Sequence, residues 1–356
     1  MAQATYQIRL KNTAGALVAL FTQENILGLR ITKSVNDVHT HELTLDATAE
    51  TRVDLFELDG QIEVWRRPPC WDWYLEYEGF HRDAEWQTDD DGREIFVSRG
   101  VGYQDILARR IIAAYAGSSE AAKSDAAETV VKEFVDEQMG SAGREPFTGL
   151  SIEADGAGGN SISISRPYRN LLEVCQEIAA IGGGDFDVVG IGAALFEFRW
   201  YDGQRGDDHT VATGTEPVIF STAFGNMLRP RLVKQSARAT AVLVAGGGEG
   251  EARAWEWRPA SLPSNWQLRE VFRDARDTDD TDTMQARGDA ELNAGRAVSE
   301  LQFDVLQTSS SVYGVHYALG DLVTARYRDA EYNLKITRVM LNFDEAEDIS
   351  LEFEDV

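Results

Sequence analysis

Apolar and polar residues alternate in short segments at both ends of the chain, which is the pattern of β-strands with one buried face. Tyr6, Ile8 and Leu10 begin this series, and residues 89–92 predict a hairpin turn before a strand over residues 94–98. The residues from 300 to the C-terminus alternate in the same way. Strands separated by turns at short intervals are typical of a β-sandwich or β-barrel. We therefore expect a β-domain at each end.

The middle of the chain has the periodicity of amphipathic helices. Residues 103–117 place Ile106, Leu107, Ile111 and Ile112 on one helical face. Further helices are predicted over residues 126–140, 168–184 and 282–298, and a β-hairpin over residues 186–201. The expected fold class is α+β, mainly β, with three domains: a β-domain over 1–103, an inserted α+β domain over 104–216, and a second β-domain with one helix over 217–356.

The two β-domains resemble each other in the order of their segments. Residues 42–46 (ELTLD) match 300–304 (ELQFD), and in each domain an Asp and a Gly precede the next strand. An acidic turn and a closing strand follow at residues 89–98 and 344–353. Antiparallel meanders can resemble each other through patterning alone. A true duplication would give one chain two copies of one β-domain.

The charge of the chain excludes a surface built to grip phosphates. Asp and Glu number 60, Lys and Arg number 34, and the net charge is −26. Most of the cations are Arg. An acidic, Lys-poor chain suits a protein that works in high salt, where carboxylate repulsion is screened. A GC-rich genome, which favours Arg codons, explains the same composition, and the sequence leaves both explanations open.

The sequence gives little support for a metal site or for a catalytic nucleophile. His39 and His41 share one strand face, but a metal needs three or four converging ligands, so a solvated or interface strand is preferred. Cys70 and Cys175 lie in different segments without a CxxC pattern, and Cys175 falls on an apolar helical face typical of a core residue. No metal ligand, catalytic residue or cofactor-binding residue is therefore assigned, and no cofactor is expected.

The glycine-rich and acidic segments have simpler explanations than phosphate or calcium binding. The glycines at 182–184 follow a predicted helix, whereas a phosphate loop precedes one, and those at 246–248 are followed by Glu249 and Glu251. The acidic run 274–282 lacks the glycine and terminal glutamate of a calcium loop, so a solvated loop is preferred. Aromatic residues near Trp71 and Trp73 suit a sugar platform, a core or a subunit contact equally.

Several segments, taken in order, resemble the tail-hub or tail-tip proteins of siphovirus-like phages and tailed archaeal viruses. These segments are LTLDA (43–47), LEYEGFHRDAEW running into GVGYQDILARRII (75–112), NLLEVCQEIAAIGGGDFDVV followed by LFEFRWYDGQRGDDHT (170–210), VIFSTAFGNM (218–227), AVLVAGGGEGEAR (241–253) and YALGDLVTARY (317–327). The resemblance implies two tube-like β-barrel or sandwich domains with an inserted α+β domain, as in baseplate hub proteins.

The same resemblance implies a function without enzymatic chemistry. It implies a homotrimer in the virion tail, made in the host cytoplasm, that closes the tail tube, adapts six-fold tube symmetry to a three-fold tip and guides DNA passage. Implied partners are a tail tube or distal tail protein above and tip, fibre or tape-measure proteins. No tight nucleic-acid binding and no membrane-spanning segment are expected. The alternative is a carbohydrate-binding or glycosidase module of a tail tip, because the many acidic residues leave a glycosidase open.

Overall fold

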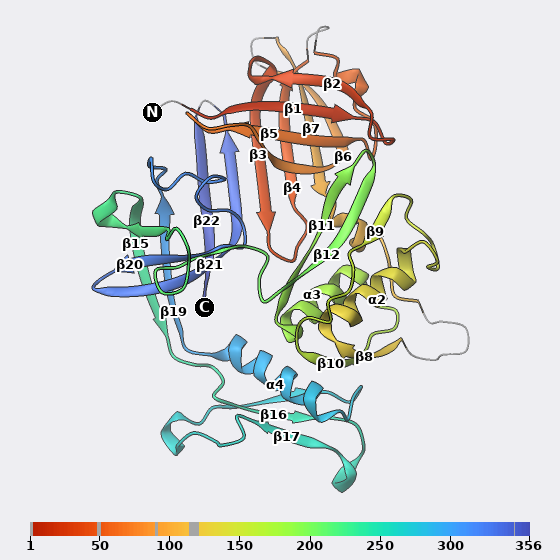
Figure 1. The fold of residues 1–356 in the computed structure, drawn as a ribbon, viewed down its shortest axis with the longest axis vertical. Coiled ribbons are helices and arrows are strands. Elements are labelled where there is room, and N and C mark those ends of the chain that lie inside the picture. Colours follow the sequence, from red (N-terminus) through yellow and green to blue (C-terminus); the bar gives the residue numbers. More distant parts are fainter. Residues whose placement is uncertain (1–2, 48–50, 90–91, 114–120, 345) are drawn as a thin grey trace.

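A computed structural model describes residues 3–47, 51–89, 92–113, 121–344 and 346–356. Its largest element is a sheet that runs through both ends of the chain (Figure 1). This sheet is mainly antiparallel and does not close into a barrel. The expected mainly β architecture is therefore confirmed.

The N-terminal part of the sheet has the order β3-β4-β7-β6-β5-β1-β2. Its strands alternate apolar and polar residues, which places one side chain in two toward a common core. The predicted hairpin joins the long β6 to β7; Gly92 has a φ of +81° and donates its N–H to the Asp89 carbonyl. Asp90 and Asp91, also part of that predicted turn, lie outside the described residues. The strands are β1 (Thr5–Lys11), β2 (Leu17–Thr22), β3 (Ile26–Ser34), β4 (Thr40–Asp46), β5 (Gln61–Arg67), β6 (Tyr74–Thr88) and β7 (Glu94–Gly102).

The C-terminal strands form a second unit beside the first. In it β20, β21 and β22 pair in that order, β13 and β14 add to β20, and β15 pairs with β19 in a separate ladder. One hydrophobic cluster runs through both units, from Ile8 and Leu43 to Val323 and Leu341. The strands are β13 (Asp208–His209), β14 (Ile219–Ser221), β15 (Met227–Gln235), β19 (Val298–Val305), β20 (Leu322–Tyr327), β21 (Ala330–Phe343) and β22 (Glu347–Asp355).

The inserted unit has its own hydrophobic cluster, built mainly from the apolar faces of two helices and one hairpin. Asn170 caps α3 through its side chain, and Gly183 ends it with a φ of +72°, so the glycines after this helix serve as a C-cap. The elements are α1 (Asp105–Ala108), β8 (Ala122–Ala126), α2 (Ala127–Met139), β9 (Leu150–Ile152), β10 (Ser161–Ser165), α3 (Leu171–Gly182), β11 (Gly184–Gly192) and β12 (Leu195–Asp202).

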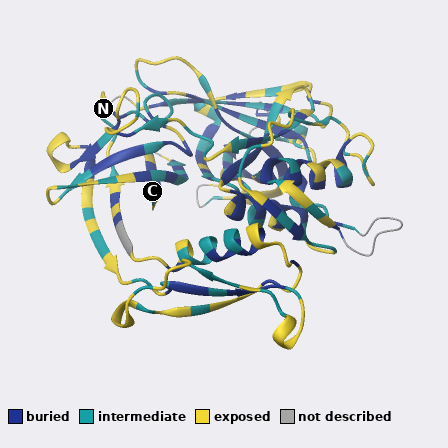
Figure 2. Ribbon diagram, turned by 60° about the horizontal axis from the view of Figure 1, so that its bottom comes forward, coloured by how far each residue is buried: buried dark blue, intermediate teal, exposed yellow. Residues whose placement is uncertain are grey.

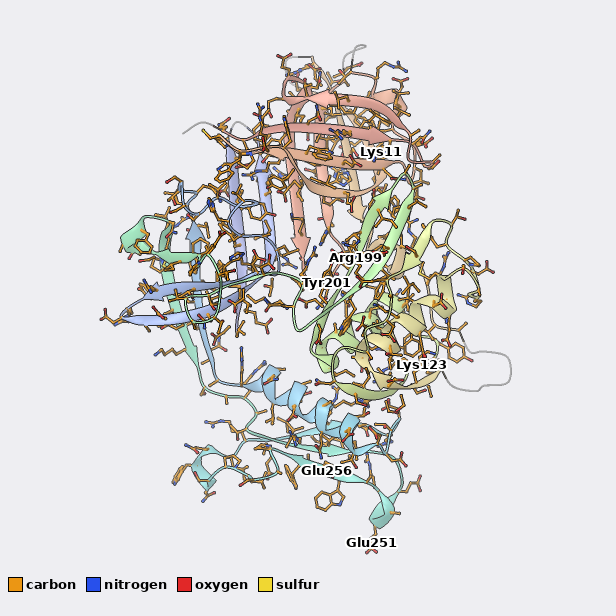
Figure 3. All side chains as sticks on the ribbon, viewed as in Figure 1. Lys11, Lys123, Arg199, Tyr201, Glu251 and Glu256 are labelled. Atoms are coloured by element: carbon orange, nitrogen blue, oxygen red, sulfur yellow. The ribbon has the colours of Figure 1, made fainter. Side chains whose placement is uncertain are left out.

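A fourth, smaller unit interrupts the second strand unit between β15 and β19. Helix α4 (Thr281–Gly295) covers one face of a three-stranded sheet of β16 (Ala241–Ala245), β17 (Trp255–Arg258) and β18 (Glu270–Asp274). This unit lies at the opposite end of the molecule from β1 (Figure 1), as the labels of Glu251 and Lys11 show (Figure 3). In Figure 2 the buried colour of this unit is confined to its centre, while its turns are exposed.

One sequence prediction was wrong in detail. In the described part of the helix predicted over residues 103–117, only α1 is helical, because the chain leaves the helix to form a bridge between Ile111 and Asn170. Ile111 is 53% exposed instead of lying on an apolar helical face, and residues 114–117 of this prediction lie outside the described residues. Within residues 217–356, the sheet of β16 to β18 forms no ladder with β15, β19 or β20 in the described chain, and has a small core of its own.

Candidate functional site: the junction of the two strand units

The two strand units meet along one ladder. β3 pairs antiparallel with the second half of β21, from Ser34 opposite Arg338 to Leu29 opposite Phe343. Leu29 and Phe343 are buried at this contact, as are Ile31 and Leu341. Burial on this scale, with continuous hydrogen bonding, joins the two units into one body instead of two domains on a linker.

A buried ion pair crosses the same junction. Arg66 on β5 makes two parallel hydrogen bonds of 2.7 Å to Glu347 at the start of β22. The Arg66 side chain is 1% exposed, and its remaining donors reach the Tyr74 hydroxyl at 2.8 Å and the Tyr313 carbonyl at 2.9 Å. The Tyr6 hydroxyl donates to Glu347 as well. Five groups from both units are therefore locked in one network, which is the condition under which a buried charge is tolerated.

Glu76 on β6 forms the second half of this network. It accepts hydrogen bonds from Tyr74 at 2.6 Å and Tyr313 at 2.8 Å, and it forms an ion pair with Lys33 on β3. Burial raises the pKa of Glu76, but Lys33, Tyr74 and Arg66 together outweigh it and hold this pKa below its usual value. The carboxylate stays ionised and ties the Tyr313 loop of the second unit to the first.

A separate polar cluster fixes the inserted unit to both strand units. Asp185 on β11 lies 2.7 Å from Lys335 of β21 and accepts a hydrogen bond of 2.9 Å from Asn36, which follows β3. Asp187 accepts from Gln104 at 2.5 Å and pairs with Arg205 at 2.8 Å. The inserted unit is thus held at the point where β3 and β21 meet.

The structure corrects the expected environment of the two histidines. His39 and His41 are 7% and 4% exposed, so the strand face they share is neither solvated nor at the surface. His41 contacts the Tyr77 hydroxyl at 2.9 Å, and His39 contacts the Ser34 carbonyl at 3.2 Å. Burial lowers the pKa of His39 to about 4 and that of His41 to about 3. Both are neutral core residues, and the described residues contain no cluster of three or more ligands suited to a metal.

Other sequence candidates also have structural roles. Cys175 is buried in the core of the inserted unit, and burial raises the pKa of its thiol, as expected of a core residue rather than a nucleophile. In the acidic run 274–282, Asp280 caps α4 by accepting from the Thr283 N–H at 2.8 Å. Asp277 pairs with Arg287 at 2.6 Å and also with Arg166 of the inserted unit. The run is therefore a helix start and an inter-unit contact.

Sequence patterns did not identify the residues that join the two strand units. No motif in the sequence singles out Arg66, and Glu347 falls within the acidic turn that precedes the last strand. Their partnership spans 281 positions, and no local pattern signals it. The available signal was the strict alternation of β5: it places Arg66 on the same face as Val64 and Ile62, which predicts an inward charge.

The strand pairing reproduces the similarity between the two ends of the chain. β6 pairs with β7 in the register that β21 uses with β22, and with β5 from Gln61 to Val64 as β21 pairs with β20. Both long strands carry a bulge, at Arg82 and at Thr337. His81 exchanges backbone hydrogen bonds with Gly60 and Asp59, and Ile336 does so with the corresponding Asp321 and Gly320. β3 and β4 correspond in turn to β15 and β19, with a register shift near the same place.

One pairing differs between the units. β4 pairs with β7, but in the described chain no ladder joins the corresponding β19 and β22, which lie side by side. A groove of about 740 Å³ lies between them, lined by Leu301, Phe303 and Leu351 among others. The second unit is therefore a more open version of the first.

A family model described as Siphovirus ReqiPepy6 Gp37-like protein matches residues 7–352. No curated protein sequence matches the chain. Among the described residues, no helix has the length and apolar character needed to cross a bilayer.

Solved structures share the fold over almost the whole chain. The tail protein from Neisseria meningitidis MC58 has a TM-score of 0.62 at 11% identity, covering 100% of this chain and 97% of its own. The prophage tail protein gp18 from Listeria monocytogenes EGD-e has a TM-score of 0.56 at 10% identity, covering 98% and 94%. The E. coli c3393 protein, a component of the type VI secretion system, has a TM-score of 0.50 at 9% identity, covering 93% and 73%.

Proposed function

The chain belongs to the Siphovirus ReqiPepy6 Gp37-like protein family, and from this premise we propose that it forms the trimeric hub that closes a viral tail tube. The family and the shared fold make it a structural protein of a phage tail or baseplate, located in the virion tail. The hub function, the trimer and the symmetry adaptation are our proposal.

The observation that carries the proposal is the presence of two similar strand units in one chain, joined edge to edge by β3 and β21. Three such chains contain six similar units. A ring of six units matches a six-fold tube on one side, while the three-fold symmetry of the chains matches a three-fold tip on the other. The inserted unit, residues 104–216, would then lie outside the ring of strand units.

The charge supports a passive role in DNA passage. At −26 per chain, a ring of three chains would carry a large negative charge, and each contact between a cation and a phosphate adds affinity for DNA. A hub of this composition would let DNA pass without holding it. We propose accordingly that the protein is not an enzyme and that its partners are tail tube or distal tail proteins above, and tip, fibre or tape-measure proteins.

The test is a count of copies. Three copies of 39.5 kDa give about 118 kDa, which light scattering of the purified full chain should report. Low-resolution images of the same sample should show a ring with three-fold symmetry and a near six-fold inner wall. Six copies of this chain in one ring would contradict the proposal, because the ring would then contain twelve strand units.

A carbohydrate-binding function remains the second candidate because aromatic side chains gather on the open face of the small unit. Trp255 and Phe272 are 62% and 56% exposed. On the sheet, β16 lies between β17 and β18, and Leu243 stands opposite both Trp257 and Phe272. Flat aromatic surfaces of this kind also suit protein contacts. Saturable binding of soluble glycans by the isolated protein, lost in Trp255→Ala, would favour this candidate; no binding would remove it.

A further inference from the structure

Within one chain, β21 uses both of its edges. Along its second half, Arg338–Phe343, β22 pairs with one edge and β3 with the other. Its residues there alternate between buried and partly buried, and Val339, Leu341 and Phe343 are at most 4% exposed. This is the environment of a central strand with a neighbour on each side.

The corresponding half of β6 has only one neighbour. Asp83–Thr88 pairs with β7 through the same register and after the same bulge, but no strand occupies the opposite edge in the described chain. All six residues are exposed, and Trp86, which corresponds to the buried Leu341, is 63% exposed. An exposed strand edge that ends in a large aromatic side chain is a template for pairing with another strand.

The free edge of Asp83–Thr88 corresponds to the edge of β21 that pairs with β3. If the internal repeat extends to this edge, the strand that pairs with it is β15. It corresponds to β3, because Leu232 stands opposite Leu301 as Leu29 stands opposite Leu43. β3 pairs on both sides, whereas β15 pairs only with β19 in the described chain. The partly exposed Leu232 and the exposed Gln235 correspond to a buried and a partly buried residue of β3. β15 therefore has a free edge that matches the free edge of β6.

From this internal repeat we infer that, in the assembled ring, β15 of one chain pairs antiparallel with residues 85–88 of β6 in the next copy of the chain. The inference rests on the proposed trimer and names the strands that close it. The register follows from the ladder of β3 and β21: Leu232 opposite Thr88, Lys234 opposite Trp86, and Gln235 opposite Glu85. Each contact is heterologous, so β3–β21 and β15–β6 ladders would alternate around a closed ring.

The charges of the two strands agree with this pairing. Residues 225–248 contain Arg229, Arg231, Lys234 and Arg238 and no carboxylate, which is unusual in a chain with a net charge of −26. The free half of β6 contains Asp83 and Glu85 and runs into three consecutive Asp residues. Opposite charges on the two strands speed their association. Like charges disfavour the pairing of β15 with another β15, or of β6 with another β6.

Pro230 is compatible with the proposed ladder. A proline within a strand has no N–H to donate and normally blocks pairing. Pro230 lies in the register shift of β15, between Leu228 and Arg231, and so precedes the four residues that would pair. It would stop the ladder from extending toward Leu228, which limits the contact to the register given above.

The test is a cysteine pair placed across the proposed ladder in the full-length chain. Glu85→Cys and Gln235→Cys are introduced together in a Cys70→Ser background, because Cys70 is exposed. The matched intrachain pair is Thr32→Cys with Met340→Cys, which stand opposite each other in the β3–β21 ladder and correspond to Gln235 and Glu85. The control for register is Glu85→Cys with Leu228→Cys, since Leu228 is 43% exposed but lies beyond Pro230.

After oxidation, we expect most of the Glu85→Cys, Gln235→Cys chain to run as covalent trimers on a non-reducing gel. Each single variant should stay monomeric on that gel, and the Thr32, Met340 pair should lose its free thiols without cross-linking chains. Light scattering of the samples before oxidation tests the trimer independently of the strand pairing. A trimer that does not cross-link, or that cross-links equally through Leu228→Cys, overturns the proposed strand pairing alone. A chain that stays monomeric by both measurements overturns the pairing and the hub proposal together.

Discussion

The buried Arg66–Glu347 pair gives the sharpest test of how the two strand units are held together. Arg66→Leu replaces the guanidinium with a shorter apolar side chain and removes two hydrogen bonds of 2.7 Å to Glu347, one of 2.8 Å to Tyr74 and one of 2.9 Å to the Tyr313 carbonyl. The Glu347 side chain is only 11% exposed, so it would be left as a buried, unpaired carboxylate. Removal of one member of a buried pair typically costs about 3–5 kcal/mol.

The measurement is hydrogen exchange of the amides in β5 and β22, because the chain has several units and global unfolding need not be two-state. A loss of about 3–5 kcal/mol corresponds to exchange faster by roughly a hundredfold to several thousandfold, since each 1.4 kcal/mol is a factor of ten. The matched control is Arg326→Leu, whose pair with Glu331 is 41% and 53% exposed. This control should change stability by about 0–1 kcal/mol.

A double variant separates the pair from its surroundings. In Arg66→Leu with Glu347→Leu no charge remains unpaired, so the combined loss should be smaller than the sum of the two single losses, with a coupling of about 2 kcal/mol or more. The reasoning is refuted if Arg66→Leu exchanges as Arg326→Leu does, or if the two single losses simply add. Either result would mean that the Arg66–Glu347 pair does not hold the junction together.

Three further predictions concern pH, salt and DNA. Burial raises the pKa of Glu78 from 4.5 to about 7, although the carboxylate accepts a hydrogen bond of 2.6 Å from the Gly190 N–H. The folded state therefore favours the protonated form of Glu78. This contributes stability below about pH 4.5 that is lost as the pH rises toward 7. Thermal melts at pH 5 and pH 8 should therefore differ less in Glu78→Gln than in the unchanged chain, and equal differences would count against this. If the carboxylate excess is an adaptation to high salt, the melting temperature should rise from low to molar salt; a temperature independent of salt would leave codon bias as the explanation. A filter-binding titration at physiological salt should show no tight DNA binding. A dissociation constant of micromolar or lower would contradict the proposal that DNA passes the acidic hub without being held.

Much of the fold follows from local patterns in the sequence. The alternation in β1 and β5 sets which side chains face the core, and the helical spacing of apolar residues does the same for α2 and α3. The order of segments in the two strand units was visible because equivalent strands keep their turn residues, such as the Asp and Gly at 59–60 and 320–321. These features depend on neighbours a few residues away, and such neighbours are visible in a single chain.

Local patterns failed where a long-range contact outweighed them. The apolar face over residues 103–117 predicted one long helix, but the pairing of Ile111 with Asn170 ended it after α1. The acidic run before α4 resembled a solvated loop, yet Asp277 is an ion-pair partner of Arg166 in another unit. The buried state of His41 depends on Tyr77 and Ser98, which lie on other strands. None of these partners is identifiable from the residues adjacent in sequence.

Local patterns were sufficient to predict two β-rich ends of similar order around a helical middle, and the composition has a large excess of acidic residues. Which strand edges meet depends instead on the tertiary structure. β3 and β15 carry similar alternation, but β3 has β21 beside it while β15 has a free edge. The alternation of β5 places Arg66 inward, but it does not identify its partner Glu347, which lies 281 positions away. Strand propensity and side-chain period are local properties, whereas the partner of an edge and the burial of a charge depend on residues hundreds of positions away.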